Sequence, residues 1–389
     1  MAKLGEVCTI VSGSTPKTSV TSYWDGNIKW ITPAELNEDT FYIMDSVRHI
    51  TEEGKEKTGL SYLPTGTVIL SSRAPIGKTA IAGCEMCCNQ GFKNLICSDA
   101  IYNEYLYFFL KSKTDYLNSL GRGATFKEIS KSIVENIEIP LPEVNQQKEI
   151  AEKFKKLEQL ISLRKQQLAK LDELVKARFV EMFEDSVANT KNFPSTTLET
   201  VMTVFPQNGL YKPQTDYVQD DTGIPILRID AFYNGKVTNW NTLKRLICSE
   251  TEIDRYLLKE NDIVINRVNS IEYLGKCAHI VGLKEKTVFE SNMMRFHMDE
   301  KKVNAVYVTE VLCTEDIYRQ ILRRAKKSVN QASINQEDVK SLEILVPPLS
   351  LQNQFAAFVE RVDKQKQTVQ QSLEKLELMK KALMQEYFG

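Results

Sequence analysis

Two long segments of the chain carry a helical pattern of hydrophobic and polar positions. Residues 145–183 and 350–388 contain no Pro or Gly and are rich in Leu, Lys, Glu and Gln, which favour helices. Apolar residues recur at the a and d positions of a heptad, and this period predicts a coiled coil. A helix of this length spans about 58 Å at a rise of about 1.5 Å per residue. The a and d residues are Ile150, Phe154, Leu157, Ile161, Leu168, Leu171, Val175 and Met182 in the first segment, and Phe355, Val359, Val362, Val369, Leu373, Leu376, Leu383 and Tyr387 in the second.

Four polar residues interrupt these apolar seams. Arg164 and Arg178 lie on the first seam, and Lys366 and Lys380 lie on the second. Polar residues at seam positions fix register and partner at some cost in stability. One hypothesis is that the four specify pairing of the first helix with the second and disfavour self-pairing. The alternative is that their aliphatic stems lie along the seam while their charges reach water, so that they specify nothing.

The rest of the chain shows short apolar runs separated by Gly, Pro, Asn and Asp. The runs at 67–70 and 262–265 predict strands, and one helix is expected near 103–120 and another near 304–327. Prolines at 140, 142, 347 and 348 end these regions and precede the long helices. We therefore predict an α+β protein with four parts. These are an α/β module at 1–144, a coiled-coil spacer helix at 145–185, a second α/β module at 186–349 and a C-terminal coiled-coil helix at 350–389.

The two halves of the chain resemble each other. At an offset of 205 residues, IEIPLP at 137–142 lies over LEILVP at 342–347, and a Gln-containing helix start follows each. The segment at 63–81 also resembles 258–280, with gaps. This pattern indicates a tandem duplication with a pseudo-two-fold internal repeat. Because each helix follows its module, an antiparallel pair of helices would place the modules at opposite ends of a rigid spacer.

Composition excludes several classes of protein. The 389 residues contain 50 Lys and Arg against 51 Asp and Glu, a formal net charge of -1, so the chain is not a histone-like polycation. A hydrophobic share of 42% is too high for a disordered chain. There is no run of about 18 apolar residues that could cross a membrane. The N-terminus lacks the pattern of a signal peptide, so we expect a cytoplasmic protein without membrane contact.

The eight cysteines fit a reducing compartment. Cys84, Cys87 and Cys88 form a C-x-x-C-C cluster that could suggest zinc. A structural zinc site needs four ligands, and the chain has only three histidines and no second C-x-x-C pair. We therefore expect no metal site, and we interpret the cluster as buried, reduced thiols in a strand.

Known catalytic motifs are missing. Adenine methylation would need an Asn/Asp-Pro-Pro-aromatic motif, but the Pro-Pro pair at 347–348 follows Val346. Gly77-Lys78-Thr79 resembles the end of a phosphate-binding loop, yet position 72 is Ser where that motif needs Gly. No H-E-x-x-H or G-x-S-x-G sequence occurs. We expect a chain without catalytic activity. The alternatives are an enzyme with an unrecognised site, such as a nuclease, and a coiled-coil assembly scaffold that does not read DNA.

These features together resemble the specificity subunit of type I restriction–modification systems. The resemblance covers the whole chain, in which two target-recognition domains alternate with two long helices. The segments that carry it are Gly13-x-Thr15-Pro16, Tyr23-Trp24-x-Gly26-x-Ile28-x-Trp30-Ile31, GTVILSSRAPIGKTAI at 66–81 with Asn89-Gln90, and Pro-Leu-Pro-x-x-x-Gln-Gln at 140–147. The second module has Phe205-Pro206-Gln207-Asn208-Gly209 in place of the Gly-x-Thr-Pro opening, so the transfer of individual residues is weaker there.

The resemblance implies a DNA-binding function. Such subunits bind an asymmetric, bipartite sequence of double-stranded DNA, and each recognition domain reads one half. Their helices recruit two methyltransferase subunits, which use S-adenosylmethionine to methylate adenine, and restriction subunits with nuclease and translocase activity can join. The chain itself is then expected to bind neither cofactor nor ATP.

Candidate DNA contacts follow from residue type, since phosphates favour Arg and Lys, and base edges favour Arg, Asn, Gln, Ser and Thr. In the first module we predict Thr15, Lys17, Tyr23, Ser71, Ser72, Arg73, Lys78, Arg122, Thr125 and Lys127. In the second we predict Tyr211, Arg228, Asn266, Arg267, Asn269, Lys276, Arg323, Arg324, Lys326, Lys327, Asn330 and Gln331. The run at 323–327 is the strongest basic patch, because clustered cations next to amides suit phosphate and base contacts. The alternative is that an isolated Arg or Lys on the surface is simply hydrated and has no role in DNA binding, which is the more common case.

The charge differs between the four parts. The net charge is -3 for 1–144, +3 for 145–183, -2 for 184–349 and +1 for 350–389. Both modules are thus acidic, so they cannot hold DNA by their overall charge, and affinity must come from local basic loops and partner subunits. We predict weak DNA binding by the isolated chain and strong binding once the methylating subunits join.

Overall fold

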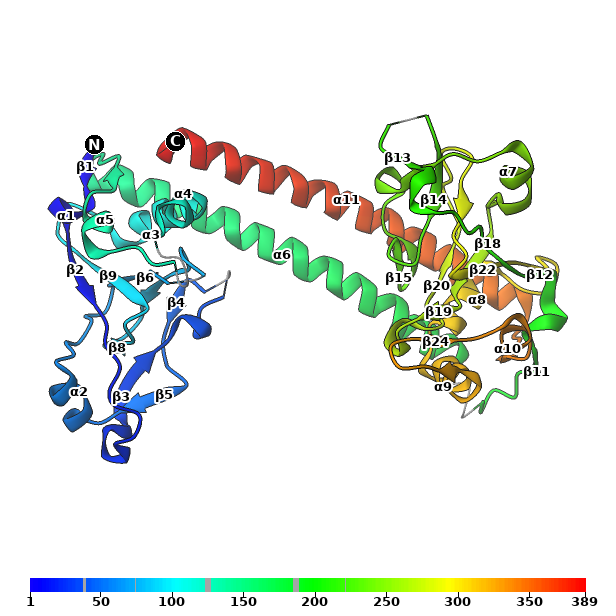
Figure 1. The fold of residues 1–389 in the computed structure, drawn as a ribbon, viewed down its shortest axis with the longest axis horizontal. Helices are drawn as coiled ribbons and strands as arrows, with labels where there is room; N and C mark the ends of the chain where they lie inside the picture. The colour runs from blue at the N-terminus through cyan, green and yellow to red at the C-terminus, as the bar shows by residue number, and fades with distance from the viewer. Residues whose placement is uncertain (38–39, 74, 123–126, 185–188, 221) are drawn as a thin grey trace. The chain divides into compact units, whose positions relative to one another are not determined.

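The computed structural model describes residues 1–389 except 38–39, 74, 123–126, 185–188 and 221 (Figure 1). The chain forms two compact units: unit 1 is Met1–Gln167 with Val369–Gly389, and unit 2 is Leu168–Thr368. Two 40-residue helices, α6 (Val144–Phe183) and α11 (Leu349–Phe388), contribute residues to both units. Each unit therefore combines one predicted module with parts of both helices, and the predicted domain limits stay predictions. No helix within the described residues is long and apolar enough to cross a membrane.

Unit 1 is built on a five-stranded sheet with strand order β2-β9-β6-β7-β4. Strand β6 (Val68–Ser71) matches the strand predicted at 67–70 and is buried on both faces. Val68 and Leu70 pack into the core beneath α3 (Asn103–Ser112), while Ile69 packs into a second cluster on the opposite face. This alternation is the two-residue period of a strand.

A second sheet of unit 1, with strand order β5-β3-β8, carries an aromatic cluster. Trp24 and Trp30 are buried and pack edge to face with ring centroids 5.1 Å apart. The Arg48 guanidinium lies 3.6 Å from the centroid of the Trp24 ring. Cys87 and Cys88 are buried in β8, and burial raises the pKa of their thiols to about 11 and about 12.

The elements of unit 1 include several short pieces besides these sheets. Those of its first 143 residues are β1 (Ala2–Lys3), α1 (Leu4–Val7), β2 (Cys8–Ser12), β3 (Trp24–Ile31), β4 (Tyr42–Ile43), β5 (Arg48–Ile50), α2 (Glu52–Thr58), β6 (Val68–Ser71), β7 (Thr79–Ala82), β8 (Cys87–Cys88), β9 (Phe92–Cys97), α3 (Asn103–Ser112), α4 (Thr114–Leu120), α5 (Lys131–Glu135) and β10 (Glu138–Ile139). The single helix expected near 103–120 is wrong, because Lys113 (φ −100°, ψ 13°) separates α3 from α4.

Unit 2 contains a six-stranded sheet ordered β12-β22-β18-β20-β16-β15, a four-stranded sheet ordered β13-β17-β14-β21 and a three-stranded sheet ordered β19-β24-β23. Strand β18 (Asp262–Asn266) matches the strand predicted at 262–265 and pairs with β22 and β20. The elements of unit 2 between the long helices are β11 (Ser195–Thr197), β12 (Met202–Asn208), β13 (Tyr217–Val218), β14 (Ile224–Leu227), β15 (Phe232–Tyr233), β16 (Gly235–Val237), β17 (Lys244–Leu246), α7 (Glu250–Tyr256), β18 (Asp262–Asn266), β19 (Val268–Asn269), β20 (Cys277–His279), β21 (Val288–Phe289), β22 (Met293–Met298), α8 (Ala305–Leu312), α9 (Glu315–Arg324), β23 (Lys326–Lys327), β24 (Ala332–Ser333), α10 (Gln336–Lys340) and β25 (Glu343–Leu345).

The helix expected near 304–327 is also wrong as a single element. Helix α8 ends at Leu312, and Thr314 starts α9 by accepting a hydrogen bond from the Ile317 backbone N–H. Helix α9 ends at Arg324, where Ala325 adopts an extended conformation (φ −63°, ψ 130°). Lys326 and Lys327 then pair with Ser333 and Ala332 as strand β23, so pairing with β24 overrides the helical pattern at these two residues.

Aromatic side chains join the long helices to each unit. In unit 1, the Phe154 ring of α6 stacks on Phe108 of α3 at 5.1 Å and on Phe388 of α11 at 5.6 Å. In unit 2, Phe179 of α6 contacts Phe355 of α11 with ring centroids 5.5 Å apart. Large buried apolar areas of this kind stabilise a fold strongly, so we attribute the attachment of helices to modules mainly to these clusters.

A buried glutamine at the start of each long helix ties that helix to its module. Gln147 has no exposed surface; its Oε1 accepts from the Tyr102 N–H at 2.8 Å, and its Nε2 donates to the carbonyls of Ala100 at 3.0 Å and Pro142 at 2.8 Å. Gln352, at the offset of 205 residues, is equally buried. It accepts from the Asn304 N–H and donates to the Pro347 carbonyl, both at 2.8 Å. The Pro- and Gln-containing segments therefore form a structural clamp in both units.

Candidate nucleic-acid interface

The loop between β6 and β7 uses most of its predicted contact residues internally. Ser71 and Ser72 are fully buried. Ser71 Oγ donates to the Pro75 carbonyl at 2.7 Å and accepts from the Lys78 N–H at 2.9 Å. Lys78 Nζ donates to the carbonyl oxygens of Pro33 at 3.3 Å and Leu36 at 2.6 Å. Ser72 Oγ accepts from Lys93 Nζ of β9 at 3.4 Å. Ser71 therefore shapes the loop, Ser72 and Lys78 tie it to neighbouring segments, and Arg73 is exposed at its surface.

Two predicted groups of unit 1 meet at Glu128. Arg73 and Arg122 each form a β-bridge with Glu128, and the Arg122–Glu128 pair exchanges two backbone hydrogen bonds of 3.0 Å. The Glu128 carboxylate also accepts from Arg73 Nε at 2.9 Å and from Lys93 Nζ at 3.1 Å. Partial burial opposes ionisation, but these two cations outweigh it and hold the pKa of Glu128 below its usual value.

The structure thus brings the exposed side chains of Arg73 and Arg122 together on either side of Glu128, and Lys127, the residue before Glu128, is also exposed. Glu128 neutralises part of this charge, because it pairs with Arg73. Neither Arg122 nor Lys127 forms an ion pair with any described residue. Thr125, the remaining member of the predicted group, lies outside the described residues.

The Gly-x-Thr-Pro opening packs against the predicted Asn-Gln segment. A Cβ atom on Gly13 would lie 2.0 Å from the Asn89 carbonyl oxygen, so this position has no room for a side chain. The Thr15 hydroxyl donates to Gln90 Oε1, and the Lys17 carbonyl accepts from Trp24 Nε1 at 3.3 Å. The two motifs therefore form one structural contact.

Only one of the three predicted residues near this opening is exposed. The Lys17 side chain is exposed, whereas Thr15 and Tyr23 are half-buried. Tyr23 packs against the cluster of buried residues that includes Trp24 and Trp30. Lys17 is therefore the member of this group that can reach a phosphate without rearrangement of the fold.

Gly209 of unit 2 occupies the equivalent position, which the sequence reading did not recognise. A Cβ atom on Gly209 would lie 2.2 Å from the Glu290 carbonyl oxygen, at the end of β21. Gly13 is crowded in the same way at the end of β8. The Phe205–Gly209 segment therefore keeps the glycine of the opening motif and differs in what surrounds it. Tyr211, two residues later, is 77% exposed.

In unit 2, the residues after β18 are only partly available. Asn266 is buried and donates from Nδ2 to the Tyr273 carbonyl at 3.3 Å. Arg267 is half-buried and donates to the Ser291 carbonyl at 3.1 Å, and Lys276 Nζ lies 3.9 Å from the centroid of the Tyr273 ring. Asn269 is half-buried in β19.

The sheet β19-β24-β23 brings this loop beside the predicted basic patch. Asn269 pairs with Ala332, and Lys327 pairs with Ala332 from the other side. Arg323, Lys326, Lys327, Asn330 and Gln331 are all exposed. Arg324 differs: its guanidinium donates to the Ser341 hydroxyl and to the carbonyls of Gln320 and Ser341 at 2.9 to 3.1 Å. Arg324 therefore caps α9 and α10 rather than presenting a free cation.

Arg228 is likewise engaged within unit 2. Its Nη1 donates to the Tyr217 hydroxyl at 3.3 Å, and its Nε lies 3.9 Å from Glu290 Oε2. The side chain is half-buried. Of the two single residues predicted in this part of unit 2, Tyr211 is thus the more available for a partner.

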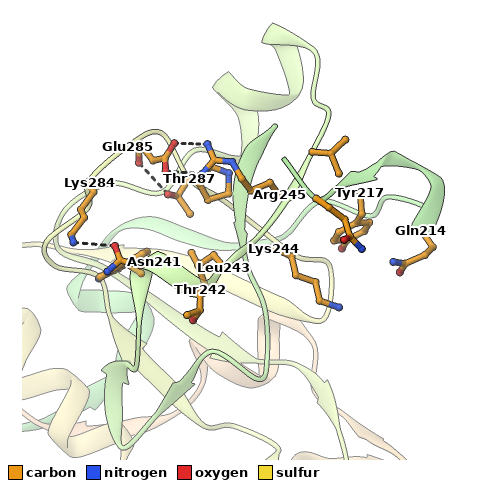
Figure 2. Close-up of a pocket in the computed structure, with 14 residues that line it drawn as sticks. Gln214, Tyr217, Asn241, Thr242, Leu243, Lys244, Arg245, Lys284, Glu285 and Thr287 are labelled. Carbon is orange, nitrogen blue, oxygen red and sulfur yellow. Dashed lines mark hydrogen bonds and ion pairs between the residues drawn. The ribbon is translucent and has the colours of Figure 1, made fainter. Parts of the chain in front are cut away.

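An open groove of about 660 Å³ in unit 2 was missed by sequence reasoning (Figure 2). Its polar lining comes from three separate segments and includes Gln214, Gln219, Asn241, Thr242, Lys244 and Lys284. Arg245 forms a two-pronged ion pair with Glu285 at 2.9 and 2.7 Å, and Lys284 Nζ donates to Asn241 Oδ1 at 3.1 Å. No local motif links these segments, so only the fold brings them together.

The four polar seam residues fall into two types. Arg164 and Arg178 bond along their own helix, to Gln167 at 2.8 Å and Glu181 at 2.7 Å. Lys380 of α11 pairs with Glu158 of α6 at 2.7 Å within unit 1. Lys366 of α11 pairs with Asp172 of α6 within unit 2. The lysines thus connect the two helices, while the role of all four in register stays a prediction.

The cysteines provide no sign of a metal centre. The eight cysteines are all free thiols. Among the described residues, no group of three or more His, Cys, Asp or Glu side chains is arranged to hold a metal ion.

Comparison with known proteins places the chain in a family. A family model described as the type I restriction modification DNA specificity domain matches residues 1–173 and 193–378. The chain is 28% identical over 386 residues to the type I restriction enzyme MjaIX specificity subunit of Methanocaldococcus jannaschii, covering 92% of this chain and 85% of the relative. It is 25% identical over 279 residues to the EcoKI specificity subunit of Escherichia coli, covering 67% of this chain and 59% of the relative.

Solved structures share the fold. The crystal structure of a type I restriction–modification S subunit from M. genitalium has a TM-score of 0.59 at 13% identity and covers all of this chain and 95% of its own. A chain from a study of assembly and conformational transition of the type I restriction–modification system has a TM-score of 0.62 at 16% identity, and the match covers all of this chain and 96% of its own. These likenesses agree with the mixed α/β class. The chain belongs to the type I restriction–modification DNA specificity family.

Proposed function

We propose that the chain is the non-catalytic subunit that reads DNA in a type I restriction–modification complex. One observation carries this proposal. In each unit, the loop after a buried strand is paired with a second segment that carries cations. In unit 1, Glu128 forms β-bridges with both Arg73 and Arg122. In unit 2, β24 pairs with β19 on one side and with Lys326–Lys327 on the other. Exposed cations grouped on loops of a rigid scaffold suit phosphate contacts, with neighbouring polar side chains for base edges.

The presence of one such surface in each unit supports a bipartite target. The family model also matches the chain twice. We infer that unit 1 and unit 2 each read one half of an asymmetric sequence in double-stranded DNA. The differing residues at the two surfaces, Arg73 and Arg122 against Lys326 and Lys327, are consistent with two different half-sites.

The long helices complete the proposal. We infer that α6 and α11 form an antiparallel coiled coil, that the chain has a two-fold internal repeat, and that the coiled coil acts as a spacer. Contacts within each unit support the pairing: Phe154 with Phe388 and Glu158 with Lys380 in unit 1, and Phe179 with Phe355 in unit 2. We propose that the helices recruit two methyltransferase subunits that bind S-adenosylmethionine, and that restriction subunits join this assembly.

The net charge of the two modules explains why a DNA-reading chain of this kind would need partner subunits to bind DNA tightly. The segments 1–144 and 184–349 carry net charges of -3 and -2, so DNA is repelled by each module as a whole and attracted only locally. Partner subunits that clamp the duplex would supply the missing affinity.

Selection from a random pool of duplexes tests this function. The full chain with its methylating subunits should enrich duplexes with two fixed blocks of bases at a constant separation, and the chain alone should bind the same duplexes weakly. A complex that assembles but enriches no sequence would contradict DNA reading and favour a coiled-coil scaffold.

A further inference from the structure

A short hairpin, made of β23, β24 and the turn between them, forms part of the three-stranded sheet β19-β24-β23 of unit 2. Lys326 and Lys327 of β23 pair with Ser333 and Ala332 of β24. The turn is closed by Ser328, whose backbone N–H and Oγ both donate to the Gln331 carbonyl, at 2.7 and 3.0 Å. All six residues from Lys326 to Gln331 are exposed. We call residues 326–333 the basic hairpin.

The cations of the basic hairpin are unpaired within the described part of the chain. Lys326 and Lys327 form no ion pair or side-chain hydrogen bond with any described residue, and neither does Arg323 at the preceding helix end. Arg324 and Lys340 nearby are, in contrast, held by Ser341 and by Glu199 with Glu337. The hairpin therefore keeps a free positive charge in a module that is acidic overall.

An apolar residue stands at the tip of this charged hairpin. Val329 is 98% exposed, the highest value among the large apolar side chains that the structure describes. It contributes almost no buried area to the fold, so protein stability gives no reason for valine here. Its neighbours, Asn330 and Gln331, are amides suited to base edges.

The dimensions and chemistry of the hairpin fit one environment. Strand β24 is held between β19 and β23, so only the turn at residues 328–331 continues beyond the Lys327–Ala332 pair. The two chain segments of this turn are narrow enough to enter the major groove of B-DNA, which admits a two-stranded ribbon. The walls of that groove are phosphates, which suit Lys326 and Lys327, and its floor presents polar base edges together with one apolar group, the 5-methyl of thymine. We propose that the basic hairpin enters the major groove of the half-site read by unit 2, and that Val329 specifies a thymine by contact with its 5-methyl group. This inference rests on the proposed DNA-reading function and adds a residue that sets specificity.

Replacement of single thymines by deoxyuridine tests the contact. The probe is a duplex that the full chain with its methylating subunits selects from a random pool, and each thymine in turn is replaced by deoxyuridine, which lacks the methyl group. We expect one replacement to weaken binding by the wild-type complex about fourfold, equivalent to the ~0.8 kcal/mol of one buried methyl group. Val329→Ala should weaken binding of the thymine duplex to a similar degree and should no longer distinguish thymine from deoxyuridine.

Two controls separate this contact from other effects. Val281→Ala removes the same two methyl groups from a valine of unit 2 that is 47% exposed, and this variant should keep the discrimination. Val329→Ala should leave the melting temperature and the salt dependence of binding unchanged, because Val329 is neither buried nor charged.

Different results would overturn the thymine contact alone or the proposed function as well. Equal sensitivity of wild type and Val329→Ala to every deoxyuridine, or no sensitivity in either, would overturn the thymine contact while leaving DNA reading intact. A complex that selects no duplex at all would overturn the proposed function and this inference together.

Discussion

The buried amide of Gln147 gives the sharpest prediction about stability. Its three hydrogen bonds are 2.8 to 3.0 Å long: those to Tyr102 and Ala100 connect α6 to the loop before α3, and the one to Pro142 holds the segment that leads into α6. Each bond contributes about 1 kcal/mol net, and removal of the amide also leaves buried backbone groups without partners. We therefore expect Gln147→Ala to lower the free energy of unfolding of unit 1 by about 3 kcal/mol or more. Alanine is the better helix former, so helix propensity opposes this loss and cannot cause it.

Two measurements check this expectation. The melting transition of unit 1 should fall by roughly 6–12 °C. The Tyr102 amide should exchange its hydrogen about 100-fold faster or more, since about 1.4 kcal/mol corresponds to a tenfold change. Gln146→Ala is the matched control, because Gln146 is the exposed neighbour on the same helix turn. Equal melting temperatures and equal Tyr102 exchange in the two variants would refute the clamp.

Three further changes test other parts of the structure. Replacing Lys326 and Lys327 together by Gln should reduce the slope of log affinity against log salt concentration by about 2, because each lost phosphate contact accounts for about 0.9. The control Lys301→Gln, at another exposed lysine, should leave the slope unchanged. Equal slopes for the double variant and the wild type would count against phosphate contacts by the hairpin. Gly209→Ala should destabilise unit 2 in thermal melts, because the new Cβ would meet the Glu290 carbonyl at 2.2 Å; an unchanged melting temperature would show that the turn has room to move. Burial lowers the pKa of His279 in the folded chain to about 4. As the pH falls, the unfolded chain therefore binds a proton at this histidine before the folded chain does. The free energy of unfolding should fall by up to about 3 kcal/mol as the pH drops from about 6.5 to about 4. His279→Gln should remove that part of the pH dependence, and a variant with the wild-type pH profile would disagree with this assignment.

The long-range pattern of the sequence predicts the main elements well. The heptads at 145–183 and 350–388 differ from α6 and α11 by one residue at the start of each helix. The runs at 67–70 and 262–265 lie in buried strands β6 and β18. Such signals survive because burial imposes a period on many consecutive residues.

Local structure was less predictable where distant segments decide it. Lys326 and Lys327 continue a helical pattern, but pairing with β24 makes them a strand. Lys113 interrupts the helix expected near 103–120, and no Pro or Gly at this residue indicates the break. Propensity is a weak guide in both places because tertiary contacts override it.

The candidate site shows the same limit. Residue type alone cannot tell which polar groups the fold uses internally. Ser71, Ser72 and Lys78 were therefore predicted contacts, although their side chains bond to Pro75, Lys93 and Leu36 within unit 1. Arg324 is similar, because its guanidinium caps two helices. The groove lined by Asn241 and other polar residues joins three segments that no motif connects.

The most direct test of DNA reading is single-molecule sequencing of methylated bases in the host genome, with and without this gene. DNA reading by two units predicts that one bipartite methyladenine motif disappears when the gene is removed and returns when it is restored. Replacing Lys326 and Lys327 by Gln should weaken methylation of that motif. An unchanged set of methylated motifs after removal of the gene would contradict the assignment of this chain as the subunit that chooses the target.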